Sequence, residues 1–373
     1  MNPTVVFIHS IDDSFGEREH ALRFGEGLAA AGIRPVYVAN PRMKEFFERL
    51  GVEVRCYRDA AEAMVIIDAL APRLAVCCEY FNLLPELQAA VAEMRWPLAT
   101  MDGTTMGVPI NVNPLRSAVP MRDFTVPARM LHLRPCPVND PNPDGGGVYH
   151  FSLFPDVRRR DGRSARATWG VPPGARLVMM AIAPWARGAA AHLGRMRHYE
   201  HLTRVISESL DGAGERYELV VVAGANAVAY SRLGRMRCVP LLQPDVFEDL
   251  LLGCDLVITD NVIQTSASKA LAAGVPALAL INSIPGKPGT PLAEPYDIFP
   301  ISVTFPKGSA YYRALAPVEI GDPVAVAARI SAIWHGAPRR GAEYFEALTR
   351  LSTPAQILED IARRDGSLDH DPT

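Results

Sequence analysis

The sequence has 373 residues, a length that predicts two domains of ordinary size. Hydrophobic residues make up 49% and charged residues 21% of it, values that argue against a disordered or collagen-like chain. The net charge of −3 argues against the basic surface with which nucleic-acid-binding proteins neutralise phosphates. No apolar run approaches the ~20 residues of a membrane span, and no signal peptide precedes the first strand-like run. We therefore expect a cytoplasmic protein without stable membrane insertion.

The cysteines and lysines add two further expectations. Six cysteines show no Cys-x-x-Cys spacing, and we interpret them as free, buried thiols in a reducing compartment. Of the 38 basic residues only four are lysines, so the position of each lysine is informative. Three of the four, Lys269, Lys287 and Lys307, fall in the C-terminal half.

Runs of β-branched residues alternate with helical periodicity through the first third of the chain. In the helical stretch 17–31, for example, Ala21, Phe24, Gly25 and Leu28 form one stripe. The alternation predicts right-handed βαβ units and a parallel sheet covered on both faces. We expect strands at 4–8, 35–39, 52–57, 74–78 and 97–100, and helices at 17–31, 40–50, 60–70 and 84–94.

A stretch rich in Pro, Asn, Asp and Gly at 135–147 interrupts the pattern and predicts an irregular segment. The arginines from Arg158 to Arg166 that follow are typical of a solvated linker. The alternation then restarts, and 366–373 predicts a frayed tail. We expect strands at 177–182, 218–223, 239–242, 256–259 and 277–281, and helices at 198–210, 245–252, 268–273, 323–333 and 340–364.

These patterns predict an α/β protein with two Rossmann-like domains whose parallel sheets face a cleft. We expect domains at 1–150 and 151–345, and a C-terminal helix and tail at 346–373 that pack back on the first domain. Ligands of this architecture bind at the carboxyl ends of the strands. The loops that follow strands are therefore the places where a site is expected.

The segment from Cys254 to Leu280 has an order of elements that binds anions. A strand ends at Thr259, a polar loop follows, and a helix opens at Thr265, Ser266 or Ser268. The unpaired N–H groups and the dipole of such a helix start attract negative charge.

This segment resembles the donor-binding part of GT-B glycosyltransferases, in particular the group that contains the lipid II N-acetylglucosaminyltransferase. Asp255 before the strand, Gly274 at the helix end and Pro276 beyond it agree with the family pattern, and Ser266 stands where the family has Thr. The loop is about one residue longer than in the family and lacks its Gly. In the N-terminal half, Gly16-Glu17 stands where many relatives have Gly-His.

The resemblance implies a glycosyltransferase, serving biosynthesis, that moves a sugar from a sugar-nucleotide or sugar-phosphate donor to an acceptor. Because the sequence shows no basic amphipathic face, we expect a small soluble acceptor and not a lipid. It implies no metal ion and no cofactor beyond the donor itself. The N-terminal domain would bind the acceptor and the C-terminal domain the donor. The implied donor-binding residues are Arg187, Gly224, Thr265, Ser266, Ser268 and Lys269, and the implied acceptor-binding residues are Glu79, Asp102 and Thr104.

Two departures from the family bear on the chemistry. Lys269 stands where relatives have a Glu that binds the donor ribose; an ammonium only donates hydrogen bonds, so it would favour a phosphate or point to solvent. Glu17 stands where a His would be the general base, and a partly desolvated carboxylate can take the same proton. Asp13 and His20 are rival bases. Alternatively, Glu17 and Glu19 are first-turn acids that favour the helix dipole.

Several motifs are absent, which narrows the class. The sequence has no His-Glu-x-x-His, no paired Cys-x-x-Cys and no Gly-x-Gly-x-x-Gly after the first strand, so neither a metal site nor a nicotinamide dehydrogenase is expected. Two alternatives stay open. One is a nucleotide-sugar 2-epimerase or hydrolase on the same fold, using Glu17, Asp102 and Asp260. The other is a non-catalytic sugar-nucleotide-binding protein, favoured by Lys269 and the missing His. The oligomeric state is not predicted.

Overall fold

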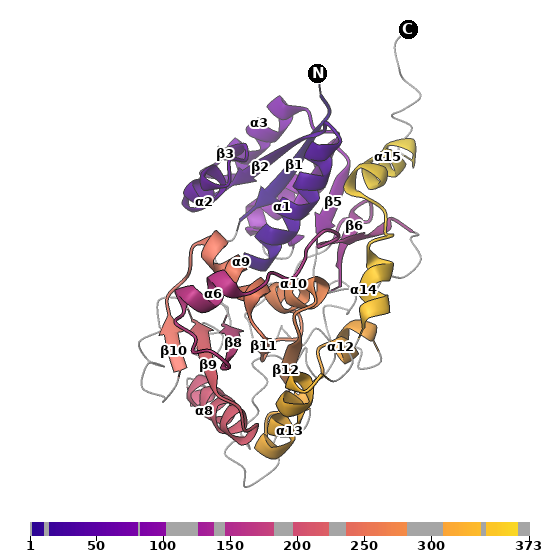
Figure 1. Cartoon of the computed structure of the whole chain (residues 1–373). Coiled ribbons are helices and arrows are strands. Elements are labelled where there is room, and N and C mark those ends of the chain that lie inside the picture. Colours follow the sequence, from indigo (N-terminus) through magenta and orange to yellow (C-terminus); the bar gives the residue numbers. More distant parts are fainter. Residues whose placement is uncertain are drawn as a thin grey trace. The chain divides into compact units, whose positions relative to one another are not determined.

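The chain forms two compact units, each built on its own parallel sheet (Figure 1). The computed structural model describes residues 2–10, 15–80, 83–101, 126–137, 146–182, 197–223, 236–281, 309–336 and 341–364. The first unit takes its described residues from 2–101, 126–153 and 347–364, and the second from 154–346. The division therefore falls directly after Leu153 and again inside a short helix near the end of the chain.

The first unit has a seven-stranded sheet in the order β3-β2-β1-β4-β5-β6-β7. All of its neighbouring strands are parallel. Its strands are β1 (Thr4–His9), β2 (Arg34–Ala39), β3 (Val54–Cys56), β4 (Leu74–Cys78), β5 (Leu98–Met101), β6 (Leu131–Cys136) and β7 (Val148–Ser152). Its helices are α1 (Phe15–Ala30), η1 (Pro41–Met43), α2 (Lys44–Arg49), α3 (Ala60–Leu70), α4 (Pro85–Ala92) and, from the end of the chain, α15 (Pro354–Arg364).

Helices cover both faces of this sheet because successive side chains of each buried strand point to opposite sides. On one face Val6 and Ile8 of β1 share a core with Ile67 of α3. On the other, Phe7 of β1 contacts Phe24 of α1, with ring centroids 6.2 Å apart. Helix α15 packs against α1 and lies beside β6 (Figure 1).

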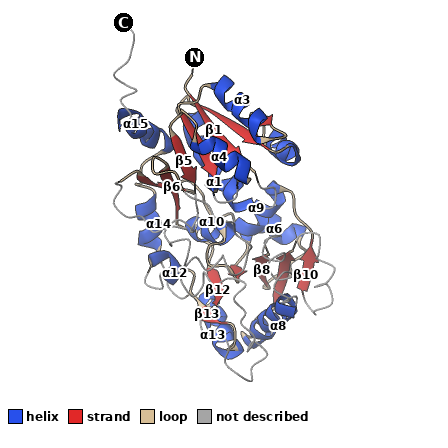
Figure 2. Cartoon of the chain, turned by 180° about the vertical axis from the view of Figure 1, so that it is seen from behind, coloured by secondary structure: helices blue, strands red, loops and turns tan. Residues whose placement is uncertain are grey.

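The second unit has a six-stranded parallel sheet in the order β10-β9-β8-β11-β12-β13. Figure 2 shows its strands in red and its helices in blue. Its strands are β8 (Arg176–Ala181), β9 (Tyr217–Val222), β10 (Met236–Val239), β11 (Leu256–Thr259), β12 (Ala277–Ile281) and β13 (Val318–Glu319). Its helices are α6 (Arg163–Thr168), α8 (Arg197–Gly212), α9 (Pro244–Gly253), α10 (Thr265–Ala273), α12 (Ala310–Ala314) and α13 (Pro323–Trp334), and α14 (Ala342–Leu348) spans the division between the units.

One face of this second sheet is covered by α8 and α13. Val178 and Met180 of β8 share a core with Ile206 of α8 and Ile330 of α13. Helix α10 contacts β11 and β12, and α9 contacts α10. The arrangement places the starts of the helices that follow β8 and β11 at the carboxyl edge of the sheet.

Most elements form where the periodicity predicts them. Four of them have the predicted bounds: the strands at 74–78, 256–259 and 277–281 and the helix at 60–70. The predicted apolar stripe of α1 is buried. All six cysteines are free; four are buried, and Cys56 and Cys238 are half-buried. None of the described helices combines the length and apolar character needed to cross a membrane.

The prediction of one helix over 340–364 was wrong, because the chain forms two helices there. The second one begins afresh at a capping box: the Thr353 N–H donates to Gln356 Oε1 (2.8 Å), and the Gln356 N–H donates to Thr353 Oγ1 (3.3 Å). The strand expected at 239–242 lies earlier, at Met236–Val239. The irregular segment expected from 135 begins later, since Pro135 and Cys136 end β6.

The interpretation of Arg158–Arg166 as a solvated linker is only partly right: Arg158, Arg159, Arg160 and Arg163 are exposed, but the segment belongs to the second unit and is not a linker. Part of the segment is helix α6, and its arginines form ion pairs within the second unit. Arg166 pairs with Asp255, and Arg160 lies 3.2 Å from Asp249 of α9. These ion pairs hold the segment against α9 and the start of β11.

A close backbone contact between Gly162 and Gly253 joins α6 to α9. Gly162 has a φ of 74°, and a Cβ there would lie 2.5 Å from the carbonyl oxygen of Gly253. Gly174 has nearly the same φ, 76°, but a Cβ there would come no nearer than 4.0 Å to another group. An alanine at Gly162 or at Gly174 therefore meets the same backbone strain, but only the alanine at Gly162 also meets a close contact.

We predict that Gly162→Ala lowers the free energy of unfolding by roughly 1–3 kcal/mol more than Gly174→Ala, because only the first substitution forces two helices apart. Both variants share the cost of a left-handed alanine. Urea unfolding of the two variants and the wild type measures the difference. Equal destabilisation would show that α6 can shift at no cost.

Candidate functional site

The strand order marks one expected ligand position in each unit. In the second sheet the chain runs outward from β8 through β9 and β10 on one side, and through β11, β12 and β13 on the other. Ligands of open α/β sheets bind at such a switch point, outside the carboxyl ends of the two central strands. These strands are β8 and β11 in the second unit, and β1 and β4 in the first.

Gln264 links the two strand ends at the switch point of the second unit. The Thr259 hydroxyl, at the end of β11, donates to Gln264 Oε1, and Gln264 Nε2 donates to the carbonyl oxygen of Ala181, at the end of β8 (2.8 Å). Sequence reasoning missed Gln264. The available signal was its position one residue before the predicted helix start.

The loop between β11 and α10 is held by its own polar groups. The Asn261 N–H donates to Thr259 Oγ1 (2.9 Å), Asn261 Oδ1 accepts from the Ile263 N–H (3.1 Å), and the Gln264 N–H donates to the Asn261 carbonyl oxygen (3.1 Å). Asp260, directly after β11, is buried. The loop therefore fixes where α10 begins, at Thr265.

The hydroxyl residues of α10 divide into two groups. Thr265 and Ser266 lie half-buried in the first turn, where the N–H groups of a helix start point outward. Ser268 is fully buried: its Oγ lies 2.8 Å from the Tyr311 hydroxyl and 3.3 Å from the Gln264 carbonyl oxygen. Burial raises the pKa of Tyr311, so both hydroxyls stay neutral. Thr265 and Ser266 are therefore more accessible from outside than Ser268.

At the switch point of the first unit, side chains from β2 and β3 bind the end of β1. Asn40 Nδ2 donates to the Ser10 carbonyl oxygen (2.8 Å), and the Tyr57 hydroxyl donates to the His9 carbonyl oxygen (2.8 Å). These bonds hold His9 and Ser10 at the carboxyl end of β1.

Glu17, in the first turn of α1, has an unused acceptor. Its side chain is half-buried, and Oε2 is buried without a hydrogen-bond partner among the described residues. His20, one turn further along, is buried; burial lowers its pKa more than Glu17 and Glu19 raise it. A lowered pKa makes the His20 imidazole a weaker base than a free histidine, whereas Glu17 keeps an oxygen with no hydrogen-bond partner among the described residues.

Glu79 follows β4, the neighbour of β1, and has an unusual backbone conformation. Its φ is 61°, in the left-handed region that non-glycine residues seldom adopt, and its N–H donates to the Met101 carbonyl oxygen (3.1 Å). Its side chain is buried. Residues held in this region often lie at functional sites. Since β1 and β4 are adjacent, Glu17 and Glu79 both belong to the switch point of this unit.

The sequence matches the family model of DUF6365, a family of unknown function, over residues 24–300. The chain belongs to DUF6365. No protein with a curated description matches the sequence.

Solved glycosyltransferases share the fold of this DUF6365 chain along its whole length. The spinosyn forosaminyltransferase SpnP is 12% identical with a TM-score of 0.60, covering 98% of this chain and 100% of its own. VinC, solved in complex with DTDP, is 11% identical with a TM-score of 0.58, and the match covers 97% of this chain and 100% of VinC. SsfS6 from Streptomyces sp. SF2575 is 16% identical with a TM-score of 0.55, and the match covers 96% of this chain and 99% of SsfS6. At these identities the likeness shows the fold, and it confirms the GT-B architecture that the sequence resemblance predicts.

Lys269 of the DUF6365 chain carries an ion pair inside the second unit. Its Nζ lies 3.1 Å from Glu248 Oε1 of α9 and 5.8 Å from the ring centroid of Phe154, and its side chain is 10% exposed. It therefore links α10 to α9 and does not point to open solvent. Asp255, the residue that agrees with the family pattern, has a similar structural role: its carboxylate accepts from the Leu177 N–H (2.8 Å) and pairs with Arg166.

The remaining predicted site residues lie outside the described part of the chain: Asp13, Asp102, Thr104, Arg187 and Gly224. Within the described part, no group of three or more His, Cys, Asp or Glu side chains is arranged to hold a metal ion.

His9, at the end of β1, supplies a pH test of the first unit. It is buried against Phe47 (ring centroids 5.3 Å apart), and its Nε2 has no hydrogen-bond partner among the described residues. Burial, with a smaller contribution from Arg18, lowers its pKa from 6.5 to about 3. The folded state therefore excludes a proton that the unfolded state binds below pH 6.5, so stability is lost as the pH falls from 6.5 toward 3.

We predict that His9→Gln reduces the loss of unfolding free energy between pH 7 and pH 5 by about 2 kcal/mol. The control is His335→Gln, which removes an exposed histidine of the second unit. Urea unfolding at the two pH values measures both variants. A His9→Gln variant with the wild-type pH dependence would mean that His9 is protonated in the folded state.

Proposed function

We propose that this DUF6365 chain is a GT-B glycosyltransferase that transfers a sugar from a nucleotide-diphosphate donor to a small acceptor without a metal ion. The observation that carries the proposal is the start of α10, which Gln264 fixes at the switch point of the second sheet. The fold shared with nucleotide-sugar transferases supports it.

The second unit would bind the donor diphosphate at the first turn of α10. The N–H groups of this turn and the helix dipole favour a phosphate, and Thr265 and Ser266 add hydroxyl donors. As the bond between the anomeric carbon and the diphosphate oxygen breaks, negative charge accumulates on the leaving diphosphate. Donors already fixed in place stabilise that charge without reorganising, which is the largest expected contribution to the rate.

The first unit would bind the acceptor, with Glu17 as the general base. The acceptor hydroxyl would attack the anomeric carbon while its proton passes to Glu17 Oε2, which has no hydrogen-bond partner among the described residues. Glu79 would position the acceptor, because its buried side chain directly follows β4, the strand next to β1. Asp13 is the second candidate base.

We predict that Ser266→Asp removes the rise in melting temperature that a nucleoside diphosphate causes in the wild type. At a ligand concentration of 100 Kd that rise corresponds to about 2.7 kcal/mol. The new carboxylate repels the diphosphate, whereas an acid in the first turn favours the helix itself, so the variant should fold. A thermal-shift series over nucleoside diphosphates measures the effect.

The matched control is Ser164→Asp, the same change at the second residue of α6 in the same unit, where the side chain is exposed. It should leave the ligand-induced shift unchanged. A nucleoside diphosphate that stabilises Ser266→Asp as much as the wild type would place the donor elsewhere. If none stabilises the wild type, the nucleotide-sugar proposal is wrong.

We predict that Glu17→Gln lowers kcat for release of the nucleoside diphosphate by roughly 10²–10⁴-fold and leaves donor affinity unchanged, because the amide cannot take the proton. Glu19→Gln is the control: Glu19 is on the same helix and pairs with Arg23 at 2.9 Å, so its loss should not affect turnover.

The same assay separates the alternatives. Turnover of the sugar nucleotide in the absence of any acceptor would favour a hydrolase or 2-epimerase. Donor binding without turnover under any condition, with no effect of Glu17→Gln, would favour a non-catalytic sugar-nucleotide-binding protein.

A further inference from the structure

The first unit contains a cavity that the proposed transfer reaction does not use. It has a volume of about 480 Å³ and lies between α15, the loop before it and β7. Arg350, Arg363 and Arg364 line it, together with one acidic residue, Asp360. The lining therefore has a net charge of two positive units, in a protein whose net charge is −3.

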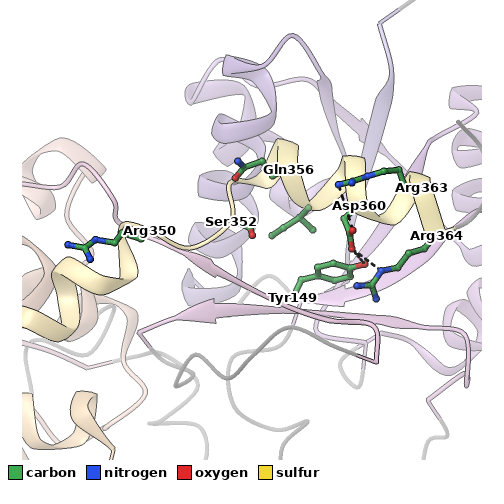
Figure 3. Close-up of a pocket in the computed structure, with 8 residues that line it drawn as sticks. Tyr149, Arg350, Ser352, Gln356, Asp360, Arg363 and Arg364 are labelled. Carbon is green, nitrogen blue, oxygen red and sulfur yellow. Dashed lines mark hydrogen bonds and ion pairs between the residues drawn. The ribbon is translucent and has the colours of Figure 1, made fainter.

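Asp360 and Tyr149 hold one of these arginines in place (Figure 3). The Tyr149 hydroxyl donates to Asp360 Oδ2 (3.0 Å), and Arg364 Nε lies 2.9 Å from the same oxygen. The guanidinium of Arg364 also lies over the Tyr149 ring, 5.3 Å from its centroid. A side chain held on two sides loses less entropy when it binds a ligand.

The ends of Arg364 and Arg363 keep hydrogen-bond donors for a ligand. Within the described part of the chain, Arg364 contacts its partner through Nε, and its terminal nitrogens make no hydrogen bond. Arg363 donates through Nε to the Glu359 carbonyl oxygen at the long distance of 3.5 Å, and its terminal nitrogen is 3.7 Å from Asp360 Oδ1. Cations in a last helical turn are common. These two differ because a cavity adjoins them.

The remaining lining is uncharged and, apart from Ile357, polar. Gln356 Oε1 accepts from the Thr353 N–H, which leaves its Nε2 group as a donor. Ser352 adds a hydroxyl, and Ile357 is a buried apolar residue. Arg350 lies at the opposite end of the cavity from Arg363 and Arg364 (Figure 3). The cavity thus combines a cationic end with a longer polar surface.

We propose that this cavity binds a phosphate monoester of sugar size, with the phosphate on Arg363 and Arg364 and the hydroxyl groups toward Gln356 and Ser352. The guanidinium groups of Arg363 and Arg364, which flank Asp360 (Figure 3), match a phosphate, whose charge at neutral pH is about −1.5 to −2, better than a carboxylate of single charge. The volume is larger than a free phosphate needs and lies in the range of small-ligand sites. The proposal does not depend on the transfer reaction.

The test is hydrogen exchange of the full chain with a hexose phosphate as the probe. We expect it to slow amide exchange in peptides that cover α15. In the double variant Arg363→Gln/Arg364→Gln, the same protection should need at least a tenfold higher concentration of the hexose phosphate. The control Arg49→Gln removes an exposed arginine of the same unit that pairs with Glu45 on its own helix, and should change nothing.

Two further probes settle the ligand class. Acetate at the same ionic strength should give no protection, and inorganic phosphate should protect at higher concentration than the hexose phosphate. Equal protection by acetate, protection that survives the double arginine change, or no protection of α15 would overturn the proposal. Inorganic phosphate that binds as tightly as the hexose phosphate would overturn its sugar part. Slower exchange in peptides of α10, and not of α15, would mean that the probe binds at the proposed donor site. The proposal for the cavity and the proposal for the donor site can therefore fail separately.

Discussion

The candidate donor site depends on the side-chain amide of Gln264. Its oxygen accepts from Thr259 at the end of β11, and its nitrogen donates to Ala181 at the end of β8, so one side chain joins two neighbouring strands. Helix α10 starts at the next residue. A shift of that helix start would break a bond at the oxygen or at the nitrogen, and a half-buried amide that loses a partner is costly. The direction of the helix start is therefore set before any ligand arrives, which electrostatic stabilisation requires.

The sequence predicts correctly the helices and strands that depend on interactions between residues close together in the chain. The helix at 60–70 begins at Asp59, whose carboxylate accepts from the Glu62 N–H (2.8 Å), and the strand at 256–259 is a short run of apolar residues. The sequence does not predict strand β6, because His132, Arg134 and Pro135 interrupt the apolar pattern. The strand forms because it pairs on one side with Ala99 to Met101 of β5 and on the other, through His132 to Cys136, with β7. Such pairing joins residues far apart in the sequence, and no window of adjacent residues contains it.

The charged residues show the same limit more sharply. The sequence predicts that Lys269 binds a phosphate or points to solvent, and that the arginines near Arg160 are solvated. The structure pairs these cations with Glu248, Asp249 and Asp255. The acid that neutralises a given cation lies about 20 or 90 residues away along the chain, so the sequence alone offers no means of choosing it. Gln264, by contrast, was overlooked because an amide next to a helix start is common, and its importance lies in two bonds that only the strand order brings together.

The two switch points differ in the kind of group they offer, and this difference fits the transfer of a sugar. The second unit offers donors, because the start of α10 directs N–H groups and hydroxyls outward. The first unit offers a hydrogen-bond acceptor, because a buried oxygen of Glu17 has no partner among the described residues. In the proposed reaction a proton leaves the acceptor while negative charge appears on the leaving diphosphate. A carboxylate can take that proton when one of its oxygens is available to accept it. The buried oxygen of Glu17 that has no partner among the described residues therefore offers a structural reason why this chain can have a glutamate where the resembling enzymes have a histidine.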